Sequence, residues 1–360
     1  MATQRTIVIS GYYGFNNVGD EAVLTSIIQD VSAEMPGVKL VVLSDNPTQT
    51  EMRYQVEAIN RWDVKRVAQV IKKSDLLISG GGSLLQDVTS LKTIPYYLGV
   101  TAIAQFYRKP VVFYSQGIGP VNHFSSRLLM KMIVSRVNHI FVREQGSKVL
   151  LEQMGIKKPP ITVSIDPVLG IKVKKEIQEK VAVSMGDKPT VGIYLRTWAA
   201  DKQLVDELVP VMQHIQQLGY QIYAIPMYYK EDSTIAKQLA SAVKGDIHVV
   251  DRELSIDEVV AYTAQFDWII GMRLHSLIMA HAVETPMIAL SYDPKVKGFI
   301  KEVGGKYCMD SQKIDSLQLN AYIDTLNSTL EAEKAHIRSV NKKKSEKIIA
   351  PAKYIREILK

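Results

Sequence analysis

Short apolar runs rich in Ile and Val alternate along the chain with longer segments of helical periodicity. Hydrophobicity within the runs is continuous rather than alternating, which predicts parallel strands covered on both faces. Six strands are expected in the first half, at residues 6–10, 39–43, 76–79, 111–115, 139–142 and 161–164. Five more are expected in the second half, at residues 190–195, 221–226, 247–250, 268–271 and 287–290. The pattern therefore predicts an α/β protein with two doubly wound parallel sheets.

A charged and weakly apolar stretch at residues 172–188 separates the two sets of predicted strands. We place the domain boundary there and expect two Rossmann-like domains, at residues 1–175 and 176–335, followed by a basic C-terminal helix at residues 336–360. The chain has 360 residues, of which 46% are hydrophobic. A chain of this length and composition can fill two separate hydrophobic cores.

The net charge of +7 is concentrated at the C-terminus, because residues 331–360 hold nine Lys or Arg against four Asp or Glu. Three lysines at residues 342–344 precede apolar residues at helical spacing, which is typical of a basic amphipathic helix. Such a helix could lie on an anionic membrane surface, dock on the protein with its lysines in water, or do both. Nucleic acid is not an expected partner, since the lysines are not interleaved with stacking aromatic residues.

The cysteine count and the N-terminus indicate a compartment. The single cysteine, Cys308, cannot form an internal disulfide, and residues 1–11 contain only a five-residue apolar run, where a signal peptide needs a longer one. No stretch approaches the roughly 20 consecutive apolar residues that span a bilayer. We expect a cytoplasmic protein, with any membrane link peripheral and at the inner face of the plasma membrane.

Unusual loops follow four predicted strands of the first domain, at the strand ends where ligands gather in an open parallel sheet. Three are rich in glycine, which lets the backbone approach a ligand closely or hold an anion in a nest of N–H groups. The fourth begins with Arg143. The spacing is not that of a P-loop, because Gly-Lys-Ser/Thr is missing. The candidate cleft residues in the glycine-rich loops are Gly14, Asn17, Gly19, Gly80, Gly81, Gly82, Gln116 and Gly117.

The first of these loops also offers two polar residues for the helix that follows it. Asn17 or Asp20 could cap this helix, and a purely structural turn is the alternative interpretation of the whole loop.

Residues 273–276, Arg-Leu-His-Ser, lie where the strand 268–271 gives way to a helix. A helix that begins there directs unpaired N–H groups and the positive end of its dipole outward. Arg273 and His275 add two more anion-binding groups, so the motif predicts a site for a small, highly charged anion. A buried pair of arginine and carboxylate beside a core histidine is the alternative. Together with the loops of the first domain, the motif indicates a ligand cleft between the domains.

Taken in order, the five motifs resemble those of the polysaccharide pyruvyl transferase family, and within it the bacterial cell-wall branch. They occupy residues 14–21, 79–83, 116–120, 143–147 and 273–276, and the resemblance extends from residue 7 to about residue 299. Glu144 stands where the family pattern Arg-Asp-x-x-Ser has Asp. This departure leaves the role of the arginine intact and makes a carboxylate role at this position less secure.

The resemblance implies a fold like that of the GT-B glycosyltransferases and a transfer of the pyruvyl group of phosphoenolpyruvate to a sugar as a cyclic ketal, with release of phosphate. Phosphoenolpyruvate is then a substrate, and no cofactor is expected. In the cell-wall branch the acceptor is a lipid-linked saccharide containing N-acetylmannosamine, a secondary cell wall polymer precursor whose product anchors surface-layer proteins. A lipid-linked acceptor would give the basic C-terminal segment a membrane surface to contact.

Phosphoenolpyruvate carries a carboxylate and a phosphate on three carbon atoms, and arginine binds both groups through paired hydrogen bonds. We expect Arg273 and Arg143 to bind this donor, with Ser276 beside them. Lys295 and Lys297 follow the last predicted strand and could add positive charge near the phosphate.

Ketal formation requires a proton at the methylene carbon, attack at C2 by one hydroxyl, loss of phosphate and attack by a second hydroxyl. His275 titrates near neutrality, so it could protonate the enol or the leaving phosphate. Asp20 is the candidate for positioning or deprotonating an acceptor hydroxyl. No metal is expected, because the reaction includes no phosphoryl transfer that needs metal clamps and the chain shows no metal-ligand spacing.

Two other functions are compatible with the pattern. A GT-B nucleotide-sugar glycosyltransferase of cell-envelope polysaccharide synthesis has the same architecture. Such enzymes usually carry a glutamate that holds the ribose in this helix, whereas Glu284 here lies at its far end. A non-catalytic saccharide-binding protein that keeps the fold is the second alternative.

Overall fold

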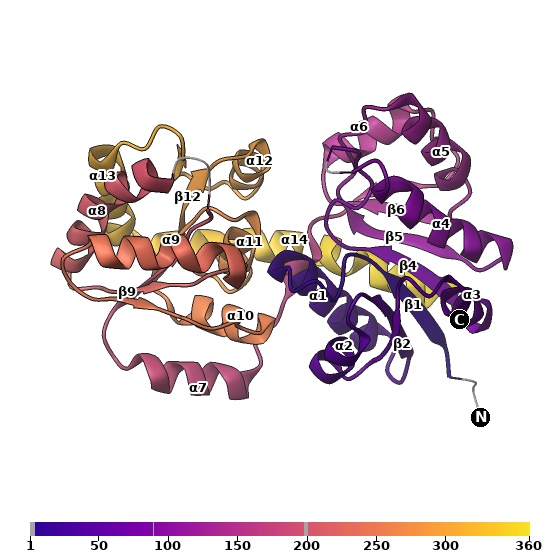
Figure 1. The fold of residues 1–360 in the computed structure, drawn as a ribbon, viewed down its shortest axis with the longest axis horizontal. Helices are drawn as coiled ribbons and strands as arrows, with labels where there is room; N and C mark the ends of the chain where they lie inside the picture. The colour runs from indigo at the N-terminus through magenta and orange to yellow at the C-terminus, as the bar shows by residue number, and fades with distance from the viewer. Residues whose placement is uncertain (1–3, 89, 198–200) are drawn as a thin grey trace. The chain divides into compact units, whose positions relative to one another are not determined.

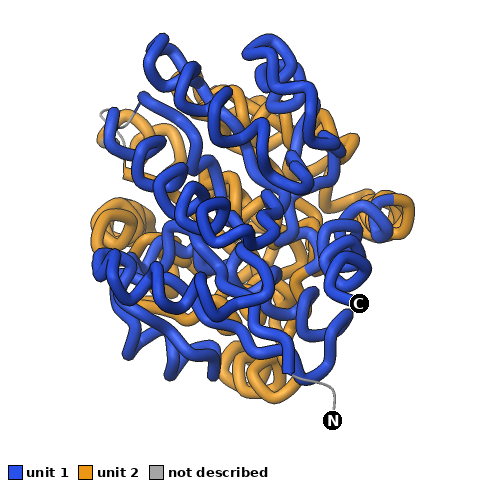
Figure 2. The backbone as a smooth tube through the Cα atoms, turned by 90° about the vertical axis from the view of Figure 1, so that its right-hand side faces the viewer, with its two compact units in different colours: residues 1–170, 344–360 blue, residues 171–343 orange. Residues whose placement is uncertain are grey.

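The structure, a computed structural model, describes residues 4–88, 90–197 and 201–360. The chain divides into two compact units (Figures 1 and 2). Unit 1 contains residues 1–170 and 344–360, and unit 2 contains residues 171–343. Each unit is built around one parallel sheet, so the functional side chains of each can be located from the order of its strands.

Unit 1 contains a seven-stranded parallel sheet with the order β3-β2-β1-β4-β5-β6-β7. Its strands are β1 (Thr6–Ser10), β2 (Lys39–Ser44), β3 (Glu57–Asn60), β4 (Leu76–Gly80), β5 (Val111–Gln116), β6 (His139–Val142) and β7 (Ile161–Val163). Successive strands are added on one side of β1 as far as β3 and then on its other side from β4 onward, so the strand order reverses between β1 and β4, where Ile7 pairs with Leu76. Ligands in this fold class bind beyond the carboxyl ends of the strands at such a switch point.

Helices cover both faces of this sheet. They are α1 (Val18–Glu34), α2 (Pro47–Tyr54), α3 (Val64–Lys73), α4 (Thr93–Phe106), α5 (Phe124–Val134), α6 (Gln145–Gln153) and the short 3-10 helix η1 (Pro167–Gly170). Apolar residues of α3, α4 and α5 share one core with the sheet, represented by Ile71, Leu98 and Met130. Continuous Val and Ile runs in the strands supply both faces, which is why the strands are apolar throughout.

Unit 2 repeats the architecture with a six-stranded parallel sheet in the order β10-β9-β8-β11-β12-β13. Its strands are β8 (Thr190–Tyr194), β9 (Gln221–Ala224), β10 (Ile247–Val249), β11 (Trp268–Gly271), β12 (Met287–Ser291) and β13 (Cys308–Asp310). Its helices are α7 (Lys175–Met185), α8 (Asp201–Gln217), α9 (Tyr229–Ala242), α10 (Ile256–Gln265), α11 (Leu274–Ala282), α12 (Pro294–Glu302) and α13 (Ser316–Ser328). The switch point of this sheet lies between β8 and β11.

The predicted fold class, two doubly wound parallel sheets, is confirmed. Each of the eleven predicted runs contains a strand, and the structure adds β3 and β13. Both added strands lie at the edge of a sheet, and they are only four and three residues long, so neither shows an apolar run of its own. The division between the units falls after Gly170 rather than after residue 175.

The last helix, α14 (Leu330–Ile358), begins six residues before the predicted start and contributes to both units. In unit 1, Ile348, Ala352, Ile355 and Leu359 are buried. Arg356 also donates to an ion pair with Glu34 in α1 at 2.7 Å. Of the two arrangements that the sequence left open, docking on the protein is therefore the one that the apolar stripe adopts, because it forms part of the core of unit 1.

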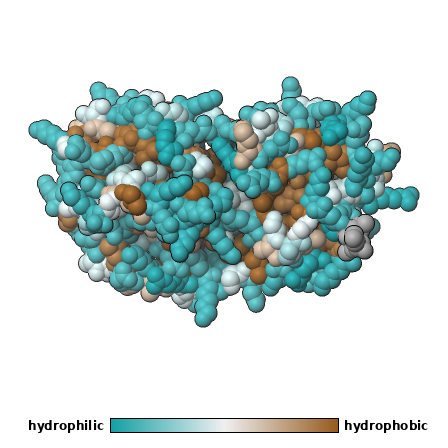
Figure 3. Space-filling view, turned by 90° about the horizontal axis from the view of Figure 1, so that it is seen from below, coloured by the Kyte–Doolittle hydropathy of each residue, from teal (hydrophilic) through white to brown (hydrophobic). Residues whose placement is uncertain are grey.

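No helix within residues 4–88, 90–197 and 201–360 is both long enough and apolar enough to cross a membrane. On the face drawn in Figure 3, hydrophilic side chains dominate and apolar ones gather in smaller areas between them.

Candidate active site

Asp20 lies in the first turn of α1, just beyond the carboxyl end of β1. Asn17 caps this helix, because its Oδ1 accepts a hydrogen bond from the backbone N–H of Gly19 at 3.0 Å. Of the two capping residues that the sequence offered, Asn17 thus fills the position. The Asp20 carboxylate instead lies against the loop after β4, where a Cβ atom on Gly82 would be 2.8 Å from its Oδ1. Only glycine allows this approach without a shift of the carboxylate.

The Asp20 carboxyl group is protonated far more readily than an ordinary aspartate. Burial raises its pKa most, the charges of Glu21 and Asp166 raise it further, and Arg143 lowers it, with the result that the pKa rises from 3.8 to about 7. A carboxyl group with a pKa near the working pH can accept and return a proton. The structure therefore makes Asp20 a candidate acid or base.

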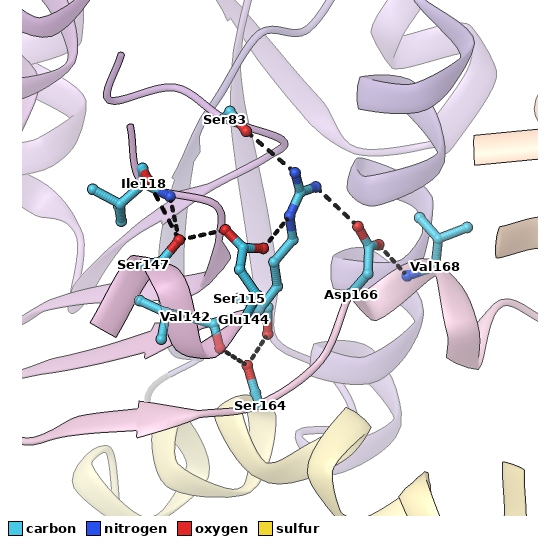
Figure 4. Close-up of polar contacts among 10 residues, drawn as sticks. Ser83, Ser115, Ile118, Val142, Glu144, Ser147, Ser164, Asp166 and Val168 are labelled. Carbon is cyan, nitrogen blue, oxygen red and sulfur yellow. Dashed lines mark hydrogen bonds and ion pairs between the residues drawn. The ribbon is translucent and has the colours of Figure 1, made fainter. Parts of the chain in front are cut away.

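Arg143, directly after β6, forms a polar cluster with three side chains at the same end of the sheet, and these partners, Ser83, Glu144 and Asp166, are labelled in Figure 4. Its Nε donates to Glu144 at 2.9 Å, its Nη1 to Asp166 at 3.1 Å and its Nη2 to Ser83 at 3.2 Å. Burial lowers the pKa of Arg143, but the two carboxylates more than offset this and raise it. The guanidinium is nearly buried and carries its charge permanently.

Two glycines bring this cluster and Asp20 together. The backbone N–H of Gly117 donates to the carbonyl oxygen of Gly82 at 3.1 Å, which joins the loops after β4 and β5. A Cβ atom on Gly117 would lie 2.8 Å from the Ser83 hydroxyl and 2.9 Å from Nε of Arg143. The absence of side chains at these two positions thus lets a titrating carboxyl group and a buried cation occupy one strand edge.

Glu144, the departure from the family pattern, takes part in this cluster. Its carboxylate accepts from Arg143 and from the Ser147 hydroxyl, and Ser147 in turn accepts from the backbone N–H of Ile118 at 2.8 Å. The longer glutamate thus still contacts both partners of the motif. A carboxylate role at this position, which the sequence left less secure, is structural here.

The other predicted loop residues of unit 1 support the loops rather than present polar side chains. The backbone N–H of Gly14 donates to Glu21 at 2.8 Å, and the side-chain amide of Gln116, fully buried, donates to the Ser79 hydroxyl at 2.9 Å. Gly19 is buried in the first turn of α1. Gly80 is the last residue of β4, and Gly81 begins the loop that carries Gly82.

An aromatic cluster surrounds a buried arginine beside this edge, and the sequence interpretation missed it. Arg61, just after β3, donates from Nη1 to the carbonyl oxygen of Gly11 at 2.9 Å. Its guanidinium carbon lies 4.4 Å from the ring centre of Tyr96 and 5.2 Å from that of Phe15, within the range of cation–π attraction. Tyr12 stacks on Phe15 with ring centres 4.0 Å apart and is exposed to solvent.

Trp62 completes the aromatic cluster. Its ring lies 5.1 Å from that of Tyr96, and its Nε1 donates to Asp45 at 2.7 Å. It is nevertheless 58% exposed. The cluster thus presents two anchored, solvent-exposed rings, those of Trp62 and Tyr12, next to polar groups.

In unit 2, Arg273 is the N-cap residue of α11 and lies just beyond β11. Its Nε and Nη2 donate to the two oxygens of the buried Asp232, both at 2.7 Å, and Nη2 also reaches Glu231 at 3.4 Å. Burial lowers the pKa of Arg273, but the hydrogen bonds and charge of Asp232 raise it by more. The arginine–carboxylate pair that the sequence left as an alternative is therefore present, although the guanidinium remains partly exposed.

The two residues that follow in the motif differ in position. His275 lies half-buried in the first turn of α11. Ser276 is completely buried, and its hydroxyl donates to the Arg273 carbonyl oxygen at 2.6 Å. Ser276 thus closes the first turn of the helix, and its contact with the donor stays a prediction.

Arg196 and Tyr292 extend the basic edge of unit 2, and neither was predicted. Arg196 follows β8, the strand next to β11, and its guanidinium carbon lies 4.8 Å from the ring centre of Tyr292, after β12. The signal for Arg196 was available, since it comes directly after a predicted strand. Arg196 and Arg273 thus lie just beyond the ends of the two strands that flank the switch point of this sheet.

The two predicted lysines lie on α12 and are both exposed. Lys297 forms an ion pair with Asp310 at 3.1 Å. The backbone N–H of Lys295 donates to Asp293, the N-cap residue of α12, at 2.7 Å, so Lys295 lies in the first turn. Of the two, Lys295 is therefore nearer to the carboxyl end of β12.

Metal ligands are not clustered in the part of the chain that the structure describes. Among residues 4–88, 90–197 and 201–360, no group of three or more His, Cys, Asp or Glu side chains could hold a metal ion.

Comparison with known protein families decides the assignment. Residues 17–294 match the family model described as Polysaccharide pyruvyl transferase, which covers most of the chain. The match includes the five motifs except for the first three residues of the first one, residues 14–16. The chain belongs to the polysaccharide pyruvyl transferase family. The family prediction is thus confirmed, whereas nothing distinguishes the cell-wall branch within it.

The chain is also similar to a protein that is named for a biosynthetic role. The amylovoran biosynthesis protein AmsJ of Erwinia amylovora is 26% identical over 259 residues, which is 65% of this chain. The match spans 60% of the length of AmsJ.

Solved structures show the same fold at low identity. HepE of Anabaena, solved with UDP-glucose, has a TM-score of 0.61 at 13% identity, covering 98% of this chain and 99% of its own. A glycosyltransferase from Rickettsia africae gives 0.63 at 15% identity over 99% of both chains. A UDP-GlcNAc 2-epimerase from Methanocaldococcus jannaschii gives 0.63 at 12% identity, over 89% of this chain and 92% of its own. These similarities place this pyruvyl transferase family member among proteins with two Rossmann-like domains.

Proposed function

We propose that this protein transfers the pyruvyl group of phosphoenolpyruvate to two hydroxyls of a saccharide, forming a cyclic ketal and releasing phosphate. The acceptor that we propose is a lipid-linked cell-wall saccharide containing N-acetylmannosamine, used at the inner face of the plasma membrane. Family membership supports the reaction class. The observation on which the mechanism depends most is the Asp20 carboxyl group, which titrates near pH 7 beside Arg143.

The proposed reaction needs an acid and a base that exchange roles. A proton is added to the methylene carbon of phosphoenolpyruvate, and the first acceptor hydroxyl forms a bond to C2. The bond from C2 to the phosphate oxygen breaks, and the second hydroxyl forms the second bond to C2. Of the two hydroxyl protons released, one balances the proton taken up at carbon and the other leaves with the phosphate.

Asp20 suits the deprotonation of an acceptor hydroxyl. Its pKa of about 7 means that roughly half of the molecules carry the base form at neutral pH. Arg143, held by Glu144 and Asp166, keeps a fixed positive charge nearby and favours that ionised form. His275, on unit 2, is the group that we propose protonates the donor.

The basic edge of unit 2 supports donor binding. Arg196, Arg273 and Lys295 follow β8, β11 and β12, and α11 and α12 both begin there, so their N–H groups and dipoles also favour anions. Asp232 accepts from Nε and Nη2 of Arg273, and Glu231 accepts from Nη2, which orients the guanidinium with its Nη1 as the group to bind phosphoenolpyruvate. We propose that these groups bind the carboxylate and phosphate.

The aromatic cluster of unit 1 supports acceptor binding. Sugar rings present apolar C–H faces that stack on aromatic rings, and exposed, anchored rings bind them without losing side-chain entropy. Trp62 is anchored by Asp45 and Tyr12 by Phe15. We propose that the exposed faces of Trp62 and Tyr12 contact the acceptor saccharide.

Incubation of the full chain with phosphoenolpyruvate and a lipid-linked N-acetylmannosamine-containing disaccharide tests the proposal. The expected product gains the mass of one pyruvate less one water, with one phosphate released per ketal. Asp20→Asn is the catalytic control, and Gly99→Ala, in the middle of α4 with no atom within 4 Å of the added Cβ, is the neutral one. An unmodified saccharide with intact donor would reject the reaction.

Thermal unfolding separates this function from nucleotide-sugar transfer, because a ligand stabilises only the state that it binds. We expect phosphoenolpyruvate, and not UDP, to raise the melting temperature. The reverse result would favour a glycosyltransferase. Tight glycan binding without turnover of any donor would favour a saccharide-binding protein.

A further inference from the structure

Helix α5 of unit 1 carries an apolar stripe that no other part of the described chain covers. Phe124, Leu128 and Met132 are 80%, 49% and 52% exposed. Their spacing of four residues puts all three on one face of the helix. Other apolar residues of the same helix, such as Met130 and Val134, are buried in the core of unit 1. The helix is thus apolar on two sides, one packed inward and one facing solvent.

Basic residues border this stripe. Helical geometry places Arg127 and Lys131 along one side of it, and Arg136 follows the end of the helix. No Asp or Glu occurs between residues 121 and 143. An apolar stripe flanked by positive charge, on a segment without negative charge, complements an anionic bilayer surface.

The acidic side chain that contacts the segment before α5 is turned inward. Asp87, in the loop after β4, accepts hydrogen bonds from the backbone N–H groups of Asn122 and His123 at 2.9 Å each and is buried. Burial raises its pKa, but these hydrogen bonds outweigh that effect and lower it. Asp87 thus holds the N-terminus of α5 in place, with its negative charge directed at these backbone N–H groups.

A neighbouring helix extends the stripe. The side-chain amide of Gln105, in the last turn of α4, donates to the carbonyl oxygen of Ile133 in α5 at 2.8 Å. Phe106, the last residue of α4, is 80% exposed, and Arg108 and Lys109 follow it. Apolar and basic side chains therefore occur together at the ends of both helices, which lie side by side in Figure 1.

We propose that α5, with Phe124, Leu128 and Met132 inserted between lipid headgroups, is the surface by which the protein binds an anionic membrane. The segment that the sequence suggested for this role, the end of α14, has its apolar residues in the core. Phe124 begins α5, at the same end of the sheet as Asp20, so an acceptor anchored in the bilayer by its lipid would lie near the edge of unit 1 that carries the candidate base. The access of a lipid-anchored acceptor to Asp20 rests on the proposed function, whereas membrane binding by α5 does not.

Sedimentation of the full chain with vesicles of phosphatidylglycerol and phosphatidylethanolamine tests the proposal without donor or acceptor. The variant F124Q/L128Q/M132Q is expected to bind these vesicles at least tenfold more weakly than the wild type, because insertion and charge are both needed for stable anchoring. The matched control is M52Q/V183Q/L317Q, which removes three exposed apolar side chains elsewhere and should bind as the wild type does. R127Q/K131Q should lose the preference for anionic over phosphatidylcholine vesicles.

Three results would overturn the proposal. The wild type could fail to bind anionic vesicles, F124Q/L128Q/M132Q (the α5 variant) could bind them as tightly as the wild type, or the wild type could be a dimer that the α5 variant converts to a monomer. The last would make the stripe an interface between two copies of the chain. Unchanged circular dichroism and thermal unfolding verify that the variant is folded. Activity of the α5 variant on a detergent-dispersed acceptor, with loss on a vesicle-borne one, separates membrane docking from catalysis; docking without any ketal product would reject the proposed function alone.

Discussion

Asp20→Asn tests the electrostatic basis of the site directly. Burial and the charges of Glu21 and Asp166 raise the pKa of Asp20 from 3.8 to about 7, with a smaller opposing effect from Arg143. One pKa unit corresponds to about 1.4 kcal/mol, so ionised Asp20 costs the folded state about 4 kcal/mol. Partial solvent exposure of the side chain reduces this to about 2–3 kcal/mol.

The sign of the effect follows from proton binding. Between about pH 4 and pH 7, the folded state holds a proton on Asp20 that the unfolded state has released. Stability therefore falls as the pH rises through this window, and asparagine, which is never charged, avoids the loss. We expect the asparagine variant to match the wild type near pH 4 and to exceed it by about 2–3 kcal/mol at pH 8.

Urea unfolding followed by circular dichroism at pH 4.5, 6 and 8 measures this difference. Asp63→Asn, which removes an exposed carboxylate at the N-cap of α3, is the control and should show no such pH-dependent gain. The variant should also lose ketal formation by about 10²–10⁴-fold, since it removes the proposed base. In the wild type, kcat/KM should rise with pH around a midpoint near 7. A stability difference that is the same at pH 4.5 and pH 8 would refute the burial of a titrating carboxyl group.

Three further predictions concern geometry and substrate contacts. Gly82→Ala should lower kcat at least tenfold, because the added Cβ would displace the Asp20 carboxylate, whereas Gly99→Ala should leave kcat unchanged. Equal steady-state rates for the two variants would disprove this. Asp232→Asn should lower the free energy of unfolding by about 3 kcal/mol and raise the KM for phosphoenolpyruvate, since it releases Arg273; an unaltered KM would separate this pair from donor binding. Trp62→Ala should raise the KM for the acceptor severalfold and leave the KM for phosphoenolpyruvate unchanged. Steady-state kinetics that show an unchanged KM for the acceptor would exclude stacking of the sugar on Trp62.

Much of the candidate site could be located from the sequence, because its residues follow predicted strands. Arg143, Gly82 and Asp20 each come after an apolar run, and parallel strands place their carboxyl ends at one edge. Asp166 was missed, although it follows the predicted strand at 161–164, because nothing local marks it as the partner of Arg143. That pairing depends on β6 and β7 being neighbours in the sheet.

Arg61 shows a different limit of sequence interpretation. Its partners come from the loop after β1 and from α4, up to 50 residues away, and they are aromatic rings and a carbonyl oxygen rather than carboxylates. No spacing rule predicts such a set, since each contact arises only after the sheet has formed. The same holds for the exposed stripe of α5, because its apolar residues look in the sequence like an ordinary core helix.

The sequence by itself determined where most of the strands lie along the chain, the loops that carry glycine, and the family. Apolar runs of this kind can be covered only from both faces, and five motifs in one order are specific. The tertiary structure alone decided which charges meet. The pKa of Asp20, the pairing of Arg273 with Asp232 and the inward apolar face of α14 all depend on burial and on neighbours from distant segments, and these quantities exist only in the packed chain.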